Sequence, residues 1–232
     1  FFDGQKDVTK RAHIHTTMRQ LIEQLPPFDE FKQMWAPAYD DWMAFYWEGF
    51  SQTSLYTYIL DVSIEENEIV DNTAHQVRKA LKKTADELTF FTDGSIDDLI
   101  LSTNNLLHKK GVSQMDGEYT KTFFEALIAN GSGAVVGLKK ADGTIVSSGG
   151  IGWDDGCLYF ILTADIDEAR GTGVAARLIL EIIRLAKLKN IDKFDFMGSM
   201  NETVHRSRMN WGATLTPYHF ISKSNSKILK AI

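Results

Sequence analysis

At 232 residues, the chain is long enough to form one large domain or two small ones around a hydrophobic core. Hydrophobic residues make up 44% of it and charged residues 24%, as in ordinary soluble globular proteins, and no apolar run approaches the roughly 20 residues of a membrane-spanning helix. The net charge of −6 argues against a general binder of DNA or RNA, because such proteins need an excess of lysine and arginine.

The cysteine and histidine content limits the chemistry further. A single cysteine, Cys157, excludes an internal disulfide, and its apolar surroundings favour a buried structural thiol over a nucleophile. The six histidines are scattered, so no spacing predicts a metal site. No secretory signal is visible, and the expected compartment is a reducing cytoplasm. Because the sequence begins with Phe1 rather than methionine, an upstream targeting signal would not be seen.

The first part of the chain is rich in aromatic side chains. Residues 1–17 lack periodicity and predict a loop, whereas residues 17–25 predict a short helix that Pro26 and Pro27 end. A dense aromatic group follows, which favours a core or an interface over a stacking wall for a substrate. It consists of Trp42, Phe45, Tyr46, Trp47 and Phe50.

A strand and a basic helix come next. Alternation over residues 56–62 predicts a half-buried strand. Ser63 and Glu66 have the spacing of a capping box, which predicts a helix that runs in two pieces to Ala85. Its basic residues favour a solvated helix face, with a local basic groove as the alternative. They are Arg78, Lys79, Lys82 and Lys83.

The pattern then becomes a regular succession of strands and helices. Residues 87–92 predict a strand, Ser95 begins a helix that ends near His108, and residues 119–130 predict a further helix. This change of pattern places an expected domain boundary near residue 85. The two parts are an N-terminal segment, residues 1–85, and a C-terminal domain, residues 86–232.

The C-terminal part contains the most informative stretch. Two Asp-Gly turns separate three apolar runs, residues 134–138, 144–151 and 157–163, which predict an antiparallel meander. Apolar residues at three- and four-residue spacing predict a helix from Val174 to about Leu188. A strand over residues 193–197 follows, and then a short helix that Ser199 begins and Gly212 ends. This order of meander, glycine turn, helix, strand and helix resembles a known arrangement that holds an acyl thioester between two diverging strands.

The glycine turn before the long helix is a candidate phosphate site. Backbone N–H groups at such a turn, together with the helix dipole, hold a pyrophosphate, although ordinary turns share this pattern. Acetyl-coenzyme A binding N-acetyltransferases use Arg-x-x-Gly-x-Ala at this place. The residues expected to contact the donor are Leu162, Thr163, Arg170, Gly171, Thr172, Gly173 and Ala175.

Polar side chains on the next strand and helix are the candidates for chemistry. Asp195 is expected to orient an amine or accept its proton, or else to satisfy backbone groups. Ser199 and Glu202 match a capping box, which favours a structural serine over a catalytic one. His205 and Arg208 lie three residues apart on one helix face, so either is a candidate to contact an anionic substrate or to serve a structural role.

Several fragments in order resemble the Fem-type aminoacyltransferases and their FemAB-like and BioF2-like relatives in the GNAT superfamily. The matching fragments are residues 45–53, 56–58, 78–80, 195–200 and 211–213. The resemblance implies an α/β fold with a mixed sheet, in which residues 86–232 form a GNAT-like domain and the N-terminal residues form part of a second one. Met197 stands where the family often has glutamate, and His75 where it usually has arginine.

The resemblance also implies an N-acyltransferase that moves an acyl group to an amine without a covalent enzyme intermediate. Acetyl-coenzyme A is the expected donor, and an aminoacyl ester of tRNA is the alternative. The expected acceptor is a small or lipid- or nucleotide-linked cell-envelope or polysaccharide precursor, such as an amino sugar, in a bacterium. A non-catalytic GNAT-like binding module is the remaining alternative. The residues expected near the acceptor are Trp47, Gln52, Tyr56, Arg78, Lys79 and Arg208, and those expected in catalysis are Asp195, Ser199 and His205.

Overall fold

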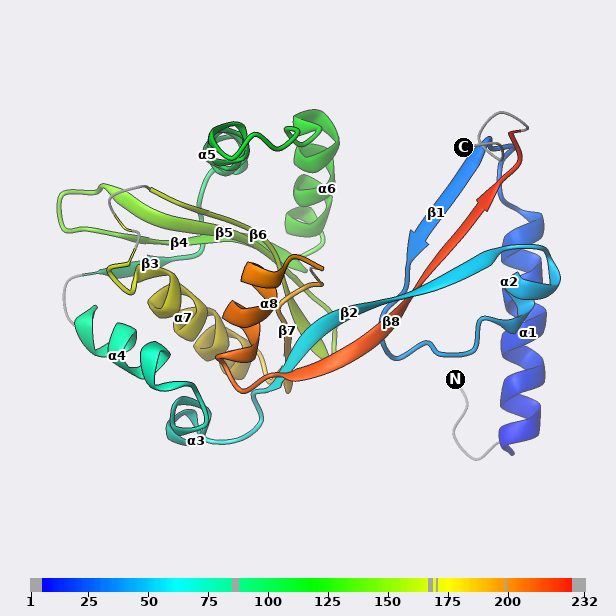
Figure 1. Cartoon of the computed structure of the whole chain (residues 1–232), viewed down its shortest axis with the longest axis horizontal. Helices are drawn as coiled ribbons and strands as arrows, with labels where there is room; N and C mark the ends of the chain where they lie inside the picture. The colour runs from blue at the N-terminus through cyan, green and yellow to red at the C-terminus, as the bar shows by residue number, and fades with distance from the viewer. Residues whose placement is uncertain (1–5, 85–87, 167–168, 170, 199, 227–232) are drawn as a thin grey trace. The chain divides into compact units, whose positions relative to one another are not determined.

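The computed structural model describes residues 6–84, 88–166, 169, 171–198 and 200–226. Helices and strands alternate along most of this chain (Figure 1). The helices are α1 (Asp7–Glu23), α2 (Met43–Trp47), α3 (Glu66–Asp71), α4 (His75–Lys83), α5 (Ile96–Lys109), α6 (Gly117–Ala129), α7 (Val174–Leu188) and α8 (Glu202–Met209). The strands are β1 (Glu30–Met34), β2 (Ser51–Asp61), β3 (Thr89–Phe91), β4 (Gly133–Lys139), β5 (Ile145–Trp153), β6 (Cys157–Asp165), β7 (Lys193–Asp195) and β8 (Thr214–Ser224).

The chain divides into two compact units. The first unit contains Phe1–Tyr56 and Thr216–Ile232, and the second contains Thr57–Leu215. Strands β2 and β8 contribute residues to both units. The domain boundary expected near residue 85 from the sequence stays a prediction.

The sheet is mixed and follows the order β1-β8-β2-β7-β6-β5-β4-β3. Strands β3 to β6 pair antiparallel with their neighbours, which confirms the predicted meander. Strand β6 pairs with β7 in parallel, and β7 pairs antiparallel with the last residues of β2. The predicted α/β class is therefore confirmed.

Helices cover both faces of the sheet in the second unit: α5 and α6 lie on one face and α7 on the other (Figure 1). Glycines in β5 allow this packing, because a Cβ atom on Gly150 would lie 2.3 Å from the Phe124 ring of α6. On the α7 face, Leu138, Ile182 and Phe194 are fully buried. The main core of the second unit thus lies between the sheet and α7.

The first unit has its own core of aromatic residues. Phe45, Phe50 and Ile221 are buried there, and the rings of Phe45 and Phe50 lie 4.9 Å apart. Two of the five clustered aromatics are exposed instead, since Tyr46 is 57% and Trp47 47% accessible. The core interpretation thus holds for part of the cluster.

Several elements differ from the sequence predictions. Residues 7–17 were expected in a loop but belong to α1, which buries none of its side chains completely and so shows no clear apolar period. Strands β1 and β8 and helix α2 were not predicted. In the described part of the chain, no helix combines the length and apolar character needed to cross a membrane.

The helix caps also test the sequence patterns. Ser95 accepts a hydrogen bond from the Asp98 N–H, which confirms it as the cap of α5. The capping box at Ser63 was wrong, because Glu65 is the N-cap of α3 and the Ser63 hydroxyl donates to Asp61. Helix α8 is capped by the Asn201 side chain. Ser199, the expected cap, lies outside the described residues.

Candidate active site

Strands β6 and β7 part after a short parallel ladder. They pair from Cys157 opposite Lys193 to Tyr159 opposite Asp195, and β7 then ends. Strand β6 continues to Asp165, and beyond Tyr159 no described strand pairs with that edge of it. Backbone N–H and C=O groups on this edge are therefore available to a partner other than a strand.

A bulge in β6 lies just past this point. Ile151 faces Phe160 and Gly150 faces Leu162, so Ile161 is the extra residue. Bulges re-aim a strand and are common beside active sites. The predicted donor contacts Leu162 and Thr163 directly follow the bulge. The Leu162 side chain packs against the cluster that contains Leu99 of α5. A ligand at this edge would therefore contact the Leu162 backbone rather than its side chain.

The glycine turn leads directly into α7. Gly171 and Gly173 have φ values of 70° and 97°, which glycine adopts readily. Gly173 is the N-cap of α7, and neither a capping side chain nor an acidic residue occupies the first turn. Helices α5, α6 and α8 begin with a capping side chain instead. The first N–H groups of α7 thus form a place for an anion.

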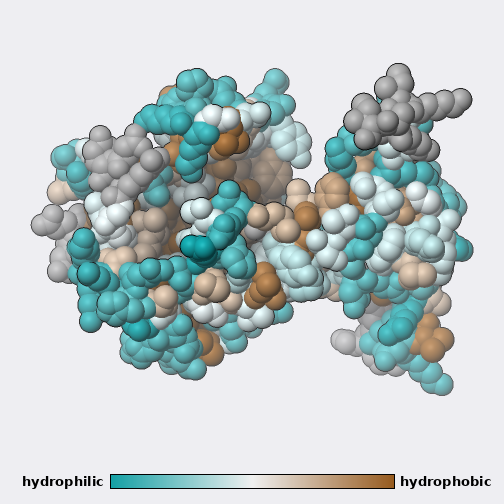
Figure 2. All heavy atoms as spheres, viewed as in Figure 1, coloured by the Kyte–Doolittle hydropathy of each residue, from teal (hydrophilic) through white to brown (hydrophobic). Residues whose placement is uncertain are grey.

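A cavity of about 1070 Å³ lies beside this turn and carries three lysines. Hydrophilic residues gather over α4 on the face that Figure 2 shows. The described lining residues are Lys82, Lys83, Thr84, Leu88, Thr89, Lys140, Ala141, Asp142, Val146, Ile166, Ala169, Thr172 and Val174. Ammonium groups next to a helix N-terminus favour a phosphate-bearing ligand.

The other predicted residues of the turn have distinct surroundings. The Thr172 hydroxyl donates to the Ala169 carbonyl at 2.5 Å and so shapes the turn. Ala175 is exposed on the first turn of α7, where its small side chain leaves the backbone accessible. Gly173 packs against α4, because a Cβ atom there would lie 2.3 Å from the Ala80 carbonyl oxygen. Arg170 lies outside the described residues.

Two of the three basic residues expected near the acceptor, Arg78 and Lys79, lie on α4 but do not line this cavity. Arg78 donates to the carbonyl oxygens of Asp71 and Thr73, which ties α4 to the end of α3. Lys79 is exposed. Lys82 and Lys83, one turn further along α4, line the cavity instead. The sequence identified the basic cluster but not which of its members meets the glycine turn.

Asp195 ends β7 and is only 3% exposed. Its Oδ1 accepts hydrogen bonds from the Thr57 hydroxyl at 2.5 Å and from the Met197 N–H at 2.8 Å. Burial raises the pKa of this carboxyl, while those two hydrogen bonds and the charge of Arg208 oppose the rise. Met197 adopts a φ of 58°, which is uncommon outside glycine and ends the strand here. The structure therefore holds a proton-binding group where β7 leaves β6.

Arg208 on α8 brings a positive charge toward the same place. Its guanidinium lies 5.1 Å from the ring centre of Phe196 and 5.7 Å from that of Phe160. Burial lowers its pKa to about 10, and the charge of Asp195 acts in the opposite direction. Its Nε is buried and has no hydrogen-bond partner among the described residues. The Nε–H group of Arg208 is therefore a hydrogen-bond donor that no described residue uses.

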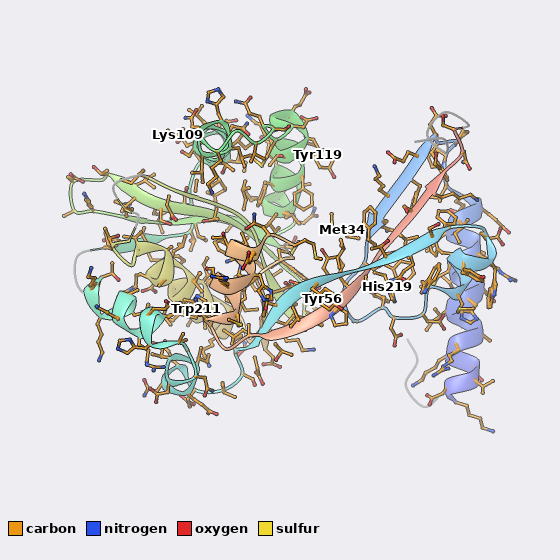
Figure 3. All side chains as sticks on the ribbon, in the orientation of Figure 1. Met34, Tyr56, Lys109, Tyr119, Trp211 and His219 are labelled. Carbon is orange, nitrogen blue, oxygen red and sulfur yellow. The ribbon has the colours of Figure 1, made fainter. Side chains whose placement is uncertain are left out.

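His205, one turn earlier on α8, contacts β2. Its Nδ1 lies 2.9 Å from the hydroxyl of Tyr58, a pairing that the sequence did not predict. Tyr58 is also bound to β7, since its carbonyl accepts a hydrogen bond from the Phe196 N–H at 3.0 Å. Asp195, His205 and Arg208 are thus linked by the residues around the end of β7. Trp211, labelled in Figure 3, is 2% exposed and belongs to the core.

Three predicted acceptor residues belong to the first unit. Trp47 stacks edge-on against His15, and the guanidinium of Arg19 lies 5.1 Å from its ring centre. Gln52 Nε2 lies 2.8 Å from the Nδ1 of His219. Tyr56, on β2 in Figure 3, is 40% exposed. Their roles stay predictions.

Nucleophilic and metal chemistry have little support in the described residues. Burial raises the pKa of the Cys157 thiol to about 12, so the thiolate needed for attack is scarce at neutral pH. In the described ranges, no group of three or more histidine, cysteine or acidic residues is placed to hold a metal ion.

No family model matches this sequence, and no curated protein matches it. Solved structures do share its fold. FemX is 10% identical with a TM-score of 0.65, and the match covers 76% of this chain and 67% of FemX. The C-terminal domain of a proposed lysylphosphatidylglycerol synthetase from Agrobacterium fabrum is 13% identical with a TM-score of 0.57, over 82% of this chain and 67% of that one.

A tandem GNAT protein from the clavulanic acid biosynthesis pathway has the same fold. It is 11% identical with a TM-score of 0.54, and the match covers 93% of this chain and 70% of that protein. These three likenesses extend over most of this chain and agree with one another. The GNAT-like fold expected from the sequence is therefore confirmed.

Proposed function

We propose that this protein is an N-acyltransferase that moves an acyl group from an acyl-coenzyme A, with acetyl-coenzyme A as the leading candidate, to an amine. One observation carries the proposal: β6 and β7 part just before a bulge in β6, and β6 leads to a glycine turn and an α7 N-terminus without a capping side chain. Backbone groups for a thioester and N–H groups for a phosphate thus lie along one continuous segment.

The donor's phosphates meet the first N–H groups of α7 beside Lys82, Lys83 and Lys140. Gly171 supports this role, since no atom lies within 4 Å of the place where its Cβ would be. A backbone N–H from residues 162–164, after the bulge, polarises the acyl carbonyl as negative charge develops on its oxygen. The rate enhancement then comes mainly from positioning and from this hydrogen bond.

Asp195 acts on the acceptor amine in this proposal. A free amine is mostly protonated at neutral pH, and it attacks only after losing a proton. Asp195, with its raised pKa, accepts that proton. The nearby positive charge of Arg208 stabilises the ionised carboxylate before the proton is transferred. His205 is the second candidate for moving protons, through its contact with the Tyr58 hydroxyl.

The acceptor is an amine on a cell-envelope or polysaccharide precursor, such as an amino sugar, in a bacterial cytoplasm. The likeness to FemX and to the proposed lysylphosphatidylglycerol synthetase supports an envelope role. Trp47, Gln52 and Tyr56 are proposed to contribute to this acceptor's binding.

Aminoacyl-tRNA is the second candidate donor, favoured by the three lysines beside the glycine turn and by the likeness to FemX. The net charge of −6 weighs against it, because tRNA binding needs a broad basic surface. A salt titration separates the two donors. Binding of tRNA falls steeply as salt rises, since counterions are released from its phosphates, whereas a flat response excludes a tRNA donor.

Thiol release from acetyl-coenzyme A in the presence of a panel of amino sugars and other amines tests the proposed reaction. We expect amine-dependent release, and a fall of about 10²- to 10⁴-fold for Asp195→Asn, as for loss of a general base. Exposed Asp93→Asn is the matched control and should keep full activity. Equal rates for wild type and Asp195→Asn would remove Asp195 from the mechanism, and no amine-dependent release would contradict acyl transfer from acetyl-coenzyme A.

A further inference from the structure

Polar residues recur along α5 at spacings of three and four, and all of them line one cavity. They are Ser95, Asp98, Ser102, Asn105 and Lys109. This spacing places them along one side of the helix. Leu99 and Thr103, on the neighbouring stripe, are 1% and 5% exposed and fix the rotation of α5 on the sheet. Core packing therefore determines where the polar stripe points.

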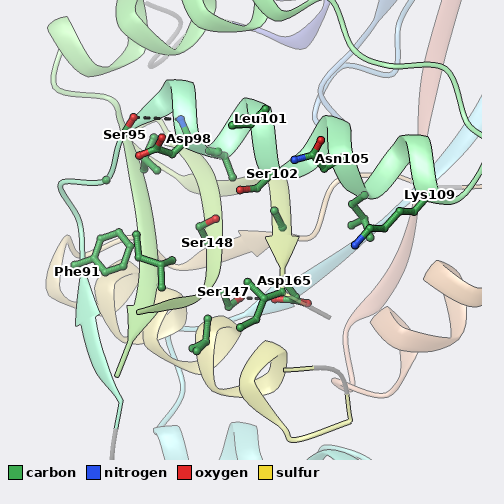
Figure 4. Close-up of a pocket in the computed structure, with 18 residues that line it drawn as sticks. Phe91, Ser95, Asp98, Leu101, Ser102, Asn105, Lys109, Ser147, Ser148 and Asp165 are labelled. Atoms are coloured by element: carbon green, nitrogen blue, oxygen red, sulfur yellow. Dashed lines mark hydrogen bonds between the residues drawn. The ribbon is translucent and has the colours of Figure 1, made fainter. Parts of the chain in front are cut away.

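The cavity has a volume of about 490 Å³ and lies between α5 and the sheet (Figure 4). Its wall on the sheet side includes Phe91, Val135, Ser148 and Ala164. Serine and alanine leave room there that larger side chains would fill. Small-molecule sites range from roughly 300 to 1,000 Å³, so the cavity is large enough for a ligand.

Four side chains in this cavity have unused hydrogen-bonding groups. No hydrogen bond to another described residue is formed by these side-chain groups: the Asp98 carboxylate, the Ser102 hydroxyl, the Asn105 amide and the Ser148 hydroxyl. In Figure 4 the Ser148 side chain points from β5 toward α5, where Ser102 and Asn105 lie. Donors and acceptors thus face one another across the space from two rigid elements.

Charges of opposite sign stand at the two ends of the stripe. Asp98 lies in the first turn of α5 and Lys109 in its last turn. Eleven residues separate them, which is roughly 16 Å along a helix. An extended tripeptide is about 10 Å long, and the flexible Lys109 side chain covers part of the remaining distance. Lys109 has another partner in the structure, but an ammonium has three N–H donors to share.

We propose that this cavity binds a short zwitterionic peptide, with its amino group at Asp98 and its carboxylate at Lys109. Ser102, Asn105 and Ser148 supply partners for its peptide groups. The cavity meets the lysine-lined cavity only at Val146 and Ile166. Of the segment proposed to contact the acyl carbonyl, residues 162–164, it includes only Ala164. The polar side chains proposed to hold the peptide thus differ from the groups proposed to hold the acyl donor.

Titration of the ¹⁵N-labelled protein with trialanine, followed by NMR, tests the site. We expect saturable shifts in α5 and β5, and binding weakened about tenfold by Asp98→Asn, which is the size expected for one lost charge-assisted contact. Asp97→Asn is the matched control: it makes the same charge change in the same turn, but Asp97 faces Lys121 and does not line the cavity. Its affinity for trialanine should equal that of the wild type.

A second variant and a second ligand keep the test decisive. Ser148→Leu fills the cavity from the sheet side and should abolish the shifts, while circular dichroism reports whether the protein still folds. N-acetyl-trialanine amide, which lacks both end charges, should bind at least tenfold more weakly. No saturable shift with trialanine, equal binding of the blocked peptide, or equal weakening by Asp97→Asn would each overturn the proposal. None of these results bears on acetyl-coenzyme A binding.

Discussion

The pKa of the buried Asp195 carboxyl depends on the residues around it. It was predicted from the alternation of its strand, and the structure places it at the end of β7 with Thr57, Met197 and Arg208 around it. No sequence pattern pointed to Thr57, because 138 positions separate the two residues. Local patterns predict which residue carries the charge, whereas its environment depends on strand pairing.

The raised pKa of Asp195 makes stability depend on pH. The folded protein holds this proton more tightly than the unfolded chain, whose carboxyl has a pKa near 3.8. As pH rises from about 3.8 through the higher folded pKa, the folded state binds more protons than the unfolded state, so the free energy of unfolding falls. This contribution is complete at low pH and lost at high pH.

Asp195→Asn removes that titration. We therefore expect the free energy of unfolding of the wild type, relative to Asp195→Asn, to decrease as pH rises through this window. Urea unfolding of both proteins between about pH 4 and pH 7 measures the difference. A difference that grows with pH would mean that the folded carboxyl has a lowered pKa, contrary to this description. Asp93→Asn, at an exposed position, shows the effect of removing a carboxylate outside the site.

At the level of elements, the glycine turn before α7 has two roles: one glycine contacts α4, and the other keeps the start of α7 accessible. Gly171 and Gly173 share the left-handed conformation but differ in their surroundings. A side chain at Gly171 would enter open space, whereas one at Gly173 would meet the α4 backbone at Ala80. Gly173 is needed for the contact between two helices, and Gly171 leaves the approach to α7 clear.

This difference predicts unequal costs for two matched substitutions. Gly171→Ala should lower the free energy of unfolding by about 1–2 kcal/mol, the cost of the left-handed conformation alone. Gly173→Ala adds a clash with backbone and should cost about 3 kcal/mol or more. Urea unfolding of the two variants checks this order. Equal losses in the free energy of unfolding would show that the α4 backbone moves aside at no energetic cost and that the close contact between Gly173 and Ala80 does not matter for stability.

Elements with strong periodicity were predictable, and those without it were not. The meander and α7 follow directly from alternation, Asp-Gly turns and three- and four-residue spacing. Helix α1 was missed because it buries no side chain completely, so its sequence need not be amphipathic. The cap of α8 was misplaced because both Ser199 and Asn201 are good capping residues, and only the backbone distinguishes them.

At the scale of the whole molecule, the first compact unit joins residues from the two ends of the chain. Strands β2 and β8 contribute to both units, so chain order and spatial grouping differ. Amino-acid composition changes with the local type of secondary structure. The compact units depend instead on contacts between residues that are distant in the sequence. The sequence predicted the fold and the glycine turn before α7. It missed the β6 bulge, the lysines that line the cavity beside this turn and the Tyr58–His205 contact.

The donor site is the central claim, and thermal unfolding with acetyl-coenzyme A tests it most directly. Binding to the folded state alone, at a hundredfold excess over the Kd, stabilises a protein by about 2.7 kcal/mol, or roughly 5–10 °C in a chain of this size. Gly171→Asp and Gly171→Asn form a matched pair, since both tolerate a positive φ and only aspartate repels phosphate. We predict a clear rise in Tm for the wild type and for Gly171→Asn, and its loss in Gly171→Asp. A wild type whose Tm does not rise, or an equal rise in both variants, would contradict an acyl-coenzyme A site at the start of α7.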